Sequence, residues 1–195
     1  MNWLIAAAFV SFSILICYSV AGAQADPAGF TAVPASMLDG SSLVLKNANV
    51  SFVAPAPDWR WLEPITNKGR NYMCFNPKTG GGATISVGEL VNDLDELTRK
   101  EITDAVRAGS MKAGNKVANE KLEAAQIPVP GHSWRYTFEA TRGDGKKLYT
   151  ILYFARTGEK SLITIQGFSI DGNDTPTFNK FVSSVKLLQE FTPKK

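Results

Sequence analysis

Residues 134–165 read WRYTFEATRGDGKKLYTILYFARTGEKSLITI, the clearest strand pattern in the chain. From Trp134 to Ala140 apolar and polar side chains alternate, so a strand here would have one apolar face and one solvent-facing face. Residues 148–154 carry large apolar side chains on both faces, which is typical of a central strand covered on both sides. Glycine-containing turns separate these two segments from each other and from a third, 162–165. The stretch therefore predicts a three-stranded antiparallel meander.

A helix is predicted after the meander. Thr175 is a suitable N-cap, and Pro176 then occupies the first helical position. Large apolar side chains recur at helical spacing and form one stripe, which predicts a face packed against the core. The stripe consists of Phe178, Phe181, Val182, Val185 and Leu188.

The sequence before the meander predicts further strands and one helix. Asn92 is a good N-cap, acidic residues fill the first turn that follows it, and Gly114 reads as the stop after Lys112. A glycine-rich turn over 76–82 predicts a hairpin between the strands on either side of it. The expected strands are 43–45, 50–53, 71–75 and 83–87, and residues 117–125 also favour a strand. Consecutive hairpins with one central and one terminal helix predict an α+β fold, an antiparallel sheet with helices on both faces.

The first 25 residues predict a cleaved leader. They carry no charged side chain, and residues 4–16 are almost continuously apolar. This length fits a signal peptide and is short of the roughly 20 apolar residues of a bilayer span. Small-x-small motifs predict cleavage after Ala25, with Ala23 as the alternative. Because no Lys or Arg precedes the apolar run, an uncleaved anchor is the other reading.

This division assigns 1–25 to the signal peptide and 26–42, rich in Ala, Pro and Gly, to a flexible lead-in. Residues 43–190 then form a single domain, and 191–195 form a tail. The domain is expected outside the cytoplasm, in the periplasm or secreted, with no membrane span after leader cleavage.

Two segments resemble one known superfamily. Val50-Ser51-Phe52-Val53-Ala54-Pro55 leads to Asp58-Trp59, and Thr84-Ile85-Ser86-Val87 follows. The chain closes on Phe178 and then Phe181-Val182-Ser183-Ser184-Val185-Lys186. This order, over roughly 50–188, resembles the PsbP-like α/β/α sandwich superfamily, which includes exported bacterial proteins of the DcrB type. The Pro-Ala-Pro-Asp-Trp spacing departs slightly from the usual one. The resemblance implies an antiparallel sheet between helices and mostly non-enzymatic roles, without a shared active-site motif.

Few residues offer catalytic chemistry. His132 is the only histidine, and Cys74 is the only cysteine after the leader. A hydrolase or thiol enzyme would have to pair these two residues as nucleophile and base, and this is the alternative to a binding role. A zinc site needs several Cys or His ligands, so no metal or cofactor site is predicted. The net charge is +3, but the basic residues are dispersed, which argues against a nucleic-acid partner.

Trp59, Arg60 and Trp61 are the candidate contact residues for a small ligand or a protein partner, neither of which the sequence identifies. Tryptophan is enriched in binding sites, and these two follow a proline-rich turn. Because they are two residues apart, they share a face if the segment is extended. Core packing explains them equally well at this stage. Trp134, on the apolar face of its strand, is expected in the core.

Overall fold

A computed structural model describes residues 29–66, 68–78, 82–89, 96–125, 127–129, 133–169 and 175–191. The predicted leader, His132 and the caps at Asn92 lie outside the described residues. No helix within the described ranges is long and apolar enough to cross a membrane.

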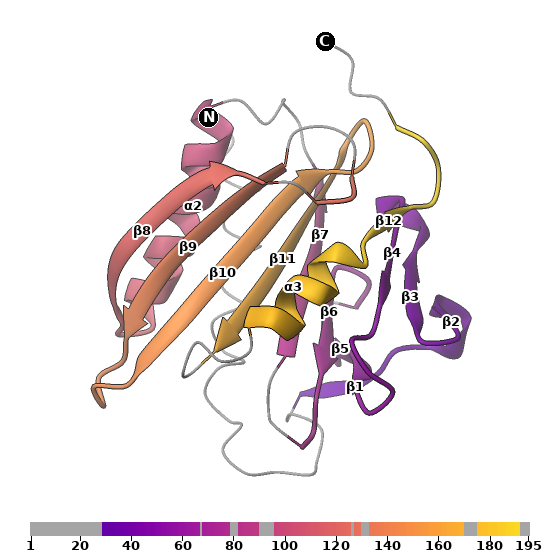
Figure 1. The fold of residues 1–195 in the computed structure, drawn as a ribbon, viewed down its shortest axis with the longest axis horizontal. Coiled ribbons are helices and arrows are strands. Elements are labelled where there is room, and N and C mark those ends of the chain that lie inside the picture. Colours follow the sequence, from indigo (N-terminus) through magenta and orange to yellow (C-terminus); the bar gives the residue numbers. More distant parts are fainter. Residues whose placement is uncertain are drawn as a thin grey trace.

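The largest element of the fold is one eight-stranded antiparallel sheet, and it contains the predicted meander (Figure 1). The meander places its second strand between the other two, in the register Leu152 opposite Tyr136 and Gln166. The hairpin predicted around 76–82 is also confirmed, since Cys74 pairs with Ala83. In order across the sheet, the strands are β1 (Phe30–Ala32), β5 (Arg60–Pro64), β6 (Asn71–Phe75), β7 (Gly82–Glu89), β11 (Ser161–Ser169), β10 (Lys147–Arg156), β9 (Ser133–Thr141) and β8 (Lys116–Ala124).

A second, four-stranded sheet stands beside the β5 end of the first (Figure 1). Its order is β12 (Lys186–Leu187), β4 (Val50–Val53), β3 (Ser42–Leu45) and β2 (Leu38–Asp39). The strands 43–45 and 50–53 were expected, but their membership of a separate sheet was not. Local patterns specify a strand and its faces, whereas the choice of partner depends on tertiary packing.

The described part of the predicted lead-in, 29–42, contains short strands that pair with the rest of the fold. Strand β1 pairs with β5, with Ala32 opposite Leu62, and Val33 is buried. A short 3-10 helix (Ala35–Met37) then leads into β2. These strands are only two or three residues long and lie in a segment rich in Ala, Pro and Gly, so the sequence pattern did not indicate them.

Within the described residues the α-helices are α2 (Glu96–Lys112) and α3 (Thr175–Ser183). Helix α2 ends as predicted, followed by Gly114 with a φ of +83°, a backbone conformation that glycine adopts without strain. The apolar stripe after Thr175 is buried up to Val185, but α3 stops at Ser183 and Leu188 is 40% exposed. The last part of the stripe therefore belongs to β12 and the residues beside it. The chain is an α+β domain, as predicted.

The apolar side chains of β10 are divided between two clusters. Ile151 and Tyr153 belong to a cluster that includes Phe178 and Phe181 of α3. Leu152, between them, belongs to a second cluster that includes Val106 of α2. Alternate strand residues point to opposite faces, which explains why 148–154 had to be apolar on both. Helix α3 contacts both β11 and β4, so it joins the large sheet to the small one.

Candidate functional site

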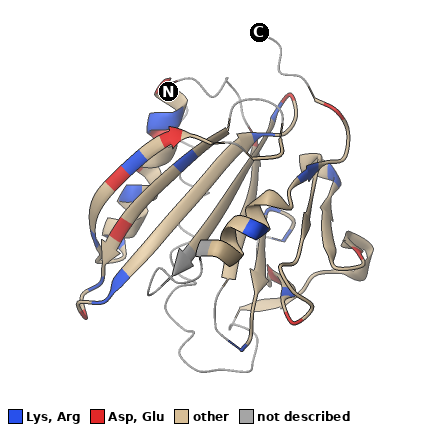
Figure 2. Cartoon of the chain, in the orientation of Figure 1, with Lys and Arg blue, Asp and Glu red and all other residues tan. Residues whose placement is uncertain are grey.

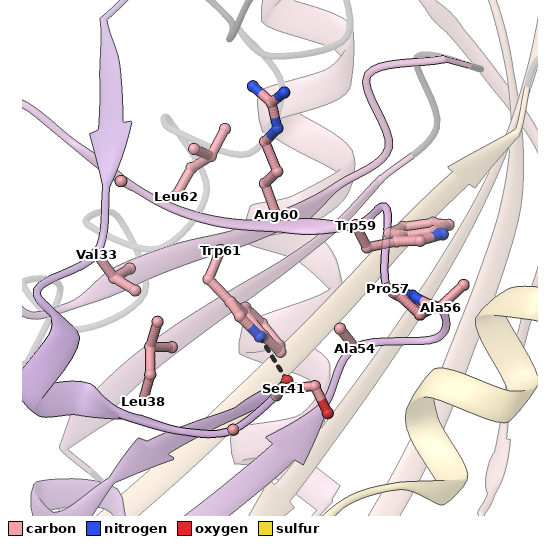
Figure 3. Close-up of a pocket in the computed structure, with 12 residues that line it drawn as sticks. Val33, Leu38, Ser41, Ala54, Ala56, Pro57, Trp59, Arg60, Trp61 and Leu62 are labelled. Carbon is pink, nitrogen blue, oxygen red and sulfur yellow. Dashed lines mark hydrogen bonds between the residues drawn. The ribbon is translucent and has the colours of Figure 1, made fainter.

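A hollow of about 550 Å³ lies where the two sheets meet, beside the predicted contact residues (Figure 3). This volume falls in the range of ligand sites, about 300–1,000 Å³. The β5 strand forms one wall, the turn from β2 to β3 another, and the chain leaving β4 a third. The hollow is lined by Ala32, Val33, Leu38, Gly40, Ser41, Ala54, Ala56, Pro57, Trp59, Arg60, Trp61 and Leu62.

Trp61 is mainly a core residue. Its side chain is only 7% exposed, and its ring centroid lies 5.9 Å from that of Phe181 in α3. Its indole nitrogen donates a hydrogen bond to the Ser41 carbonyl oxygen at 3.0 Å, across the gap between the two sheets (Figure 3). Trp61 therefore packs in the core where the two sheets meet, and it also lines the hollow.

Trp59 is less buried than Trp61. It is partly buried and packs against the same core cluster. Its backbone N–H donates a hydrogen bond to the Ala56 carbonyl at 3.1 Å, which closes the proline-rich turn. The indole ring lies near Pro57 (Figure 3). An indole held by its backbone and partly open to solvent can exchange water for an apolar ligand without disturbing the core.

Arg60 is exposed, and its side chain extends to the other side of β5 from the Trp61 ring (Figure 3). Leu62 points to the same side as Arg60, as strand alternation requires. Because both residues line the hollow, it reaches around the edge of β5. Beyond Ala32 the pairing with β5 continues for one residue, since the Val33 N–H donates to the Trp61 carbonyl at 3.2 Å.

Helix α3 holds the wall formed by the end of β4. The Val53 backbone N–H donates to Ser184 Oγ at 3.0 Å, and Lys180 Nζ donates to the Pro55 carbonyl at 3.2 Å. Ser184 Oγ also lies 2.6 Å from the Phe181 carbonyl, which it can reach as a donor. Of the residues that carried the family resemblance, Ala54 and Trp59 line the hollow, and Val53, Pro55, Phe181 and Ser184 take part in the contacts that hold this wall.

Cys74 lies directly opposite Trp61 in the β5–β6 register, but beneath the surface. It is fully buried, and burial raises the pKa of its thiol well above the usual value. A neutral, inaccessible thiol is neither a nucleophile nor a metal ligand. His132, its predicted partner in the enzyme alternative, lies outside the described residues, so the pairing itself has no geometry to report.

A charged network that the sequence analysis did not anticipate joins α2 to β8 and β9. The Tyr136 hydroxyl donates to the Glu120 carboxylate, and Arg107 Nε lies 3.5 Å from the same carboxylate. A bulge brings Glu120 there: Asn119 has a φ of +55°, and the β8–β9 register shifts beside it. Burial, followed by the hydrogen bond to Glu120, raises the pKa of Tyr136.

This network is best explained as a clamp between helix and sheet. Asp104 pairs with Lys100 and Arg107 on the same helix, and both signs of charge are interspersed over α2, β8 and β9 (Figure 2). Each of these side chains contacts another member of the network, which explains them as a structural attachment of α2 to the sheet. Among the described residues, no group of three or more His, Cys, Asp or Glu side chains could hold a metal ion.

Trp134 lies in the second apolar cluster, as expected, with the Arg99 guanidinium carbon 3.8 Å from its ring centroid. It is remote from the hollow, on the third strand from β7 in the sheet order. The three tryptophans therefore differ in their surroundings: Trp134 packs against the second cluster, Trp61 is a core residue that lines the hollow, and Trp59 is a partly buried residue that lines it.

By sequence, no family model and no curated protein matches this chain. By structure, it is similar to cyanobacterial PsbP (CyanoP) from Synechocystis sp. PCC 6803, with a TM-score of 0.57 and 11% identity over 80% of this chain and 97% of that one. At this identity the similarity shows a shared fold alone. The similarity to the PsbP fold that the sequence resemblance implied is therefore confirmed.

Two further solved structures are similar at lower scores. LpqN of Mycobacterium tuberculosis, which is involved in cell envelope biogenesis, gives a TM-score of 0.47 and 14% identity over 81% of this chain and 90% of its own. A Bacteroides thetaiotaomicron protein gives 0.44 and 14% identity over 78% of this chain, which spans only 50% of that protein. Scores this low carry no functional argument.

Proposed function

We propose that the protein is an exported, non-catalytic binding or accessory protein that acts through the hollow beside Trp59, Arg60 and Trp61. The observation that carries the proposal is the hollow itself, which has the volume of a ligand site and lies next to these residues. Apolar concave sites with a few polar groups are the usual form of small-molecule pockets. The PsbP-like fold supports an accessory role by analogy.

The burial of Cys74 weighs against the enzyme alternative, because catalysis by a thiol needs an accessible thiolate. The charged network around Glu120 is explained by helix attachment. Neither feature supplies a nucleophile and base in an open cleft, which is the arrangement that hydrolysis needs.

The binding role predicts that small apolar molecules settle in the hollow. In proton–nitrogen correlation spectra of the purified protein, indole and benzoate should shift the indole signals of Trp59 and Trp61 and the amide signals of Val33 and Ser41. A neutral disaccharide should leave these signals unchanged, because the hollow offers mainly apolar contacts. Shifts gathered elsewhere on the molecule, or no shift at millimolar concentrations of either compound, would refute the proposed site.

We further infer that α2 and α3 cover opposite faces of the large sheet. Support comes from β10, whose alternate side chains join the cluster of α3 and the cluster of α2 in turn. The domain boundaries proposed here keep the core at 43–190, with residues 30–42 adding strands to it and 191–195 as a tail.

Export is the second part of the proposal and has its own test. If the uncharged apolar leader is removed at a small-x-small site, intact-mass measurement of the exported protein should give a first residue of Asp26, or of Gln24 for the alternative site. A membrane-bound product that retains Met1 would instead establish an anchor.

A further inference from the structure

We propose that the protein self-associates through the outer edge of β8, as a dimer in which the two copies of β8 pair antiparallel about a two-fold axis at Leu122. This surface is separate from the hollow, and the inference goes beyond the proposed ligand-binding role. It follows from the exposure of β8, from the backbone groups that it presents and from the order of its charges.

Strand β8 forms one end of the large sheet, and within the described residues it is the last strand on that side (Figure 1). It is nine residues long, and all but two of its residues are exposed. Leu122, in its second half, leaves 41% of its surface open to solvent. A long edge strand with an exposed apolar side chain is a template on which another strand can pair.

The backbone of β8 presents hydrogen-bonding groups to this open edge. The Ala125 N–H donates to the Ser133 carbonyl at 2.9 Å, so these two residues form a hydrogen-bonded pair that continues the β8–β9 ladder. In an antiparallel ladder such pairs alternate with pairs that exchange no hydrogen bond. Leu122 and Ala124 occupy the alternate positions of the register. Their N–H and C=O groups therefore point away from β9, toward the open edge.

The charges on either side of Leu122 are self-complementary. Lys121 and Glu123 lie on the same face of the strand, where Lys121 Nζ is 2.6 Å from Glu123 Oε2. A two-fold axis at Leu122 places Lys121 of each copy opposite Glu123 of the other. Opposite charges that face each other directly stabilise a strand pair, whereas like charges destabilise it. Moving the axis by one residue would oppose Lys121 to Lys121, or Glu123 to Glu123, so the charges select the register centred on Leu122.

A bulge and a lysine usually protect an edge strand, and β8 carries both. The bulge beside Asn119 limits the paired length, because the register of β8 shifts there. Beyond it, Glu120 would face Ala124 of the second copy, a neutral side chain that does not compete for the carboxylate to which the Tyr136 hydroxyl donates. The lysine, Lys121, repels a positive partner but attracts the acidic residue that this strand itself supplies. The edge therefore favours a second copy over an unrelated strand.

The test is the dissociation constant of the dimer, measured by sedimentation velocity of the purified protein at increasing concentration. The unmodified protein should pass from monomer to dimer. Lys121→Glu should raise the constant roughly tenfold or more, because two attractive contacts become repulsive. Adding Glu123→Lys to that variant should restore the dimer, since opposite charges face each other again. Lys46→Glu, the same charge change in the short 3-10 helix Lys46–Ala48, should have no effect.

Leu122→Pro tests the backbone pairing independently of charge. It removes an N–H that points to the open edge and leaves the β8–β9 hydrogen bonds in place, so the variant should fold, as measured by circular dichroism, but remain a monomer.

An unmodified protein that stays monomeric at submillimolar concentration would overturn the inference. A dimer that both Lys121→Glu and Leu122→Pro leave unchanged would also overturn it, because its interface would then lie elsewhere. A double charge variant that dimerises no better than Lys121→Glu alone would refute the register centred on Leu122. Each of these results leaves the binding of indole at the hollow unaffected.

Discussion

Replacing Phe181 by alanine is expected to lower the free energy of unfolding by about 3–5 kcal/mol, as for other fully buried phenylalanines. The ring is only 1% exposed and contacts the rings of Phe52 and Trp61, with centroids 5.7 and 5.9 Å away. These three rings come from α3, from the small sheet and from the large sheet. Loss of the Phe181 ring therefore leaves a cavity at the point where α3, the small sheet and the large sheet meet. Chemical denaturation followed by circular dichroism measures the change.

Asn179→Ala provides the matched control, because Asn179 lies on the exposed side of the same helix. That variant should change stability by less than about 0.5 kcal/mol. A Phe181→Ala protein as stable as the control would show that α3 does not hold the two sheets together.

Trp61→Ala is expected to cost a similar amount, about 3–5 kcal/mol, because a nearly buried indole is removed. The substitution also removes the hydrogen bond to the Ser41 carbonyl, which leaves that oxygen with the Ala54 N–H as its remaining partner. Trp61→Phe separates the two effects, since it keeps most of the ring contact with Phe181 and loses only the hydrogen bond, worth about 1 kcal/mol.

The order of stability should therefore be wild type, Trp61→Phe and then Trp61→Ala, measured by urea denaturation. A loss below about 1 kcal/mol for the alanine variant would contradict the assignment of Trp61 to the core. Trp61 would then have to be interpreted as an exposed contact residue.

The fold could be predicted from the sequence wherever one local pattern specified it. The alternation from Trp134 to Ala140 and the two-faced apolar run at 148–154 identify the meander without any knowledge of the rest. The end of α2 was predictable as well, because Gly114 follows Lys112 at the position where a left-handed residue stops a helix.

The remaining features depend on partners that are distant in sequence. Leu187 pairs with Val50, and nothing near either residue indicates that pairing or the second sheet it completes. The same holds for the candidate site. The two-residue spacing of Trp59 and Trp61 predicted that they share a face of an extended strand. The burial of Trp61, however, depends on Phe181, which lies 120 positions later. The network at Glu120 depends on a bulge at Asn119; asparagine tolerates the left-handed conformation found there, but one asparagine within a strand pattern is not enough to predict a bulge.

The most direct test of the central claim, that the hollow is a binding site, is the effect of Trp59→Ala on the binding of indole. Trp59 borders the hollow but is only half-buried, so its removal should leave stability within about 1 kcal/mol of wild type. Tyr149→Ala, which removes an exposed aromatic ring from β10, serves as the control. When the Trp61 indole signal is followed during titration with indole, binding should be at least tenfold weaker in Trp59→Ala and unchanged in Tyr149→Ala. Equal affinity in both folded variants would contradict it.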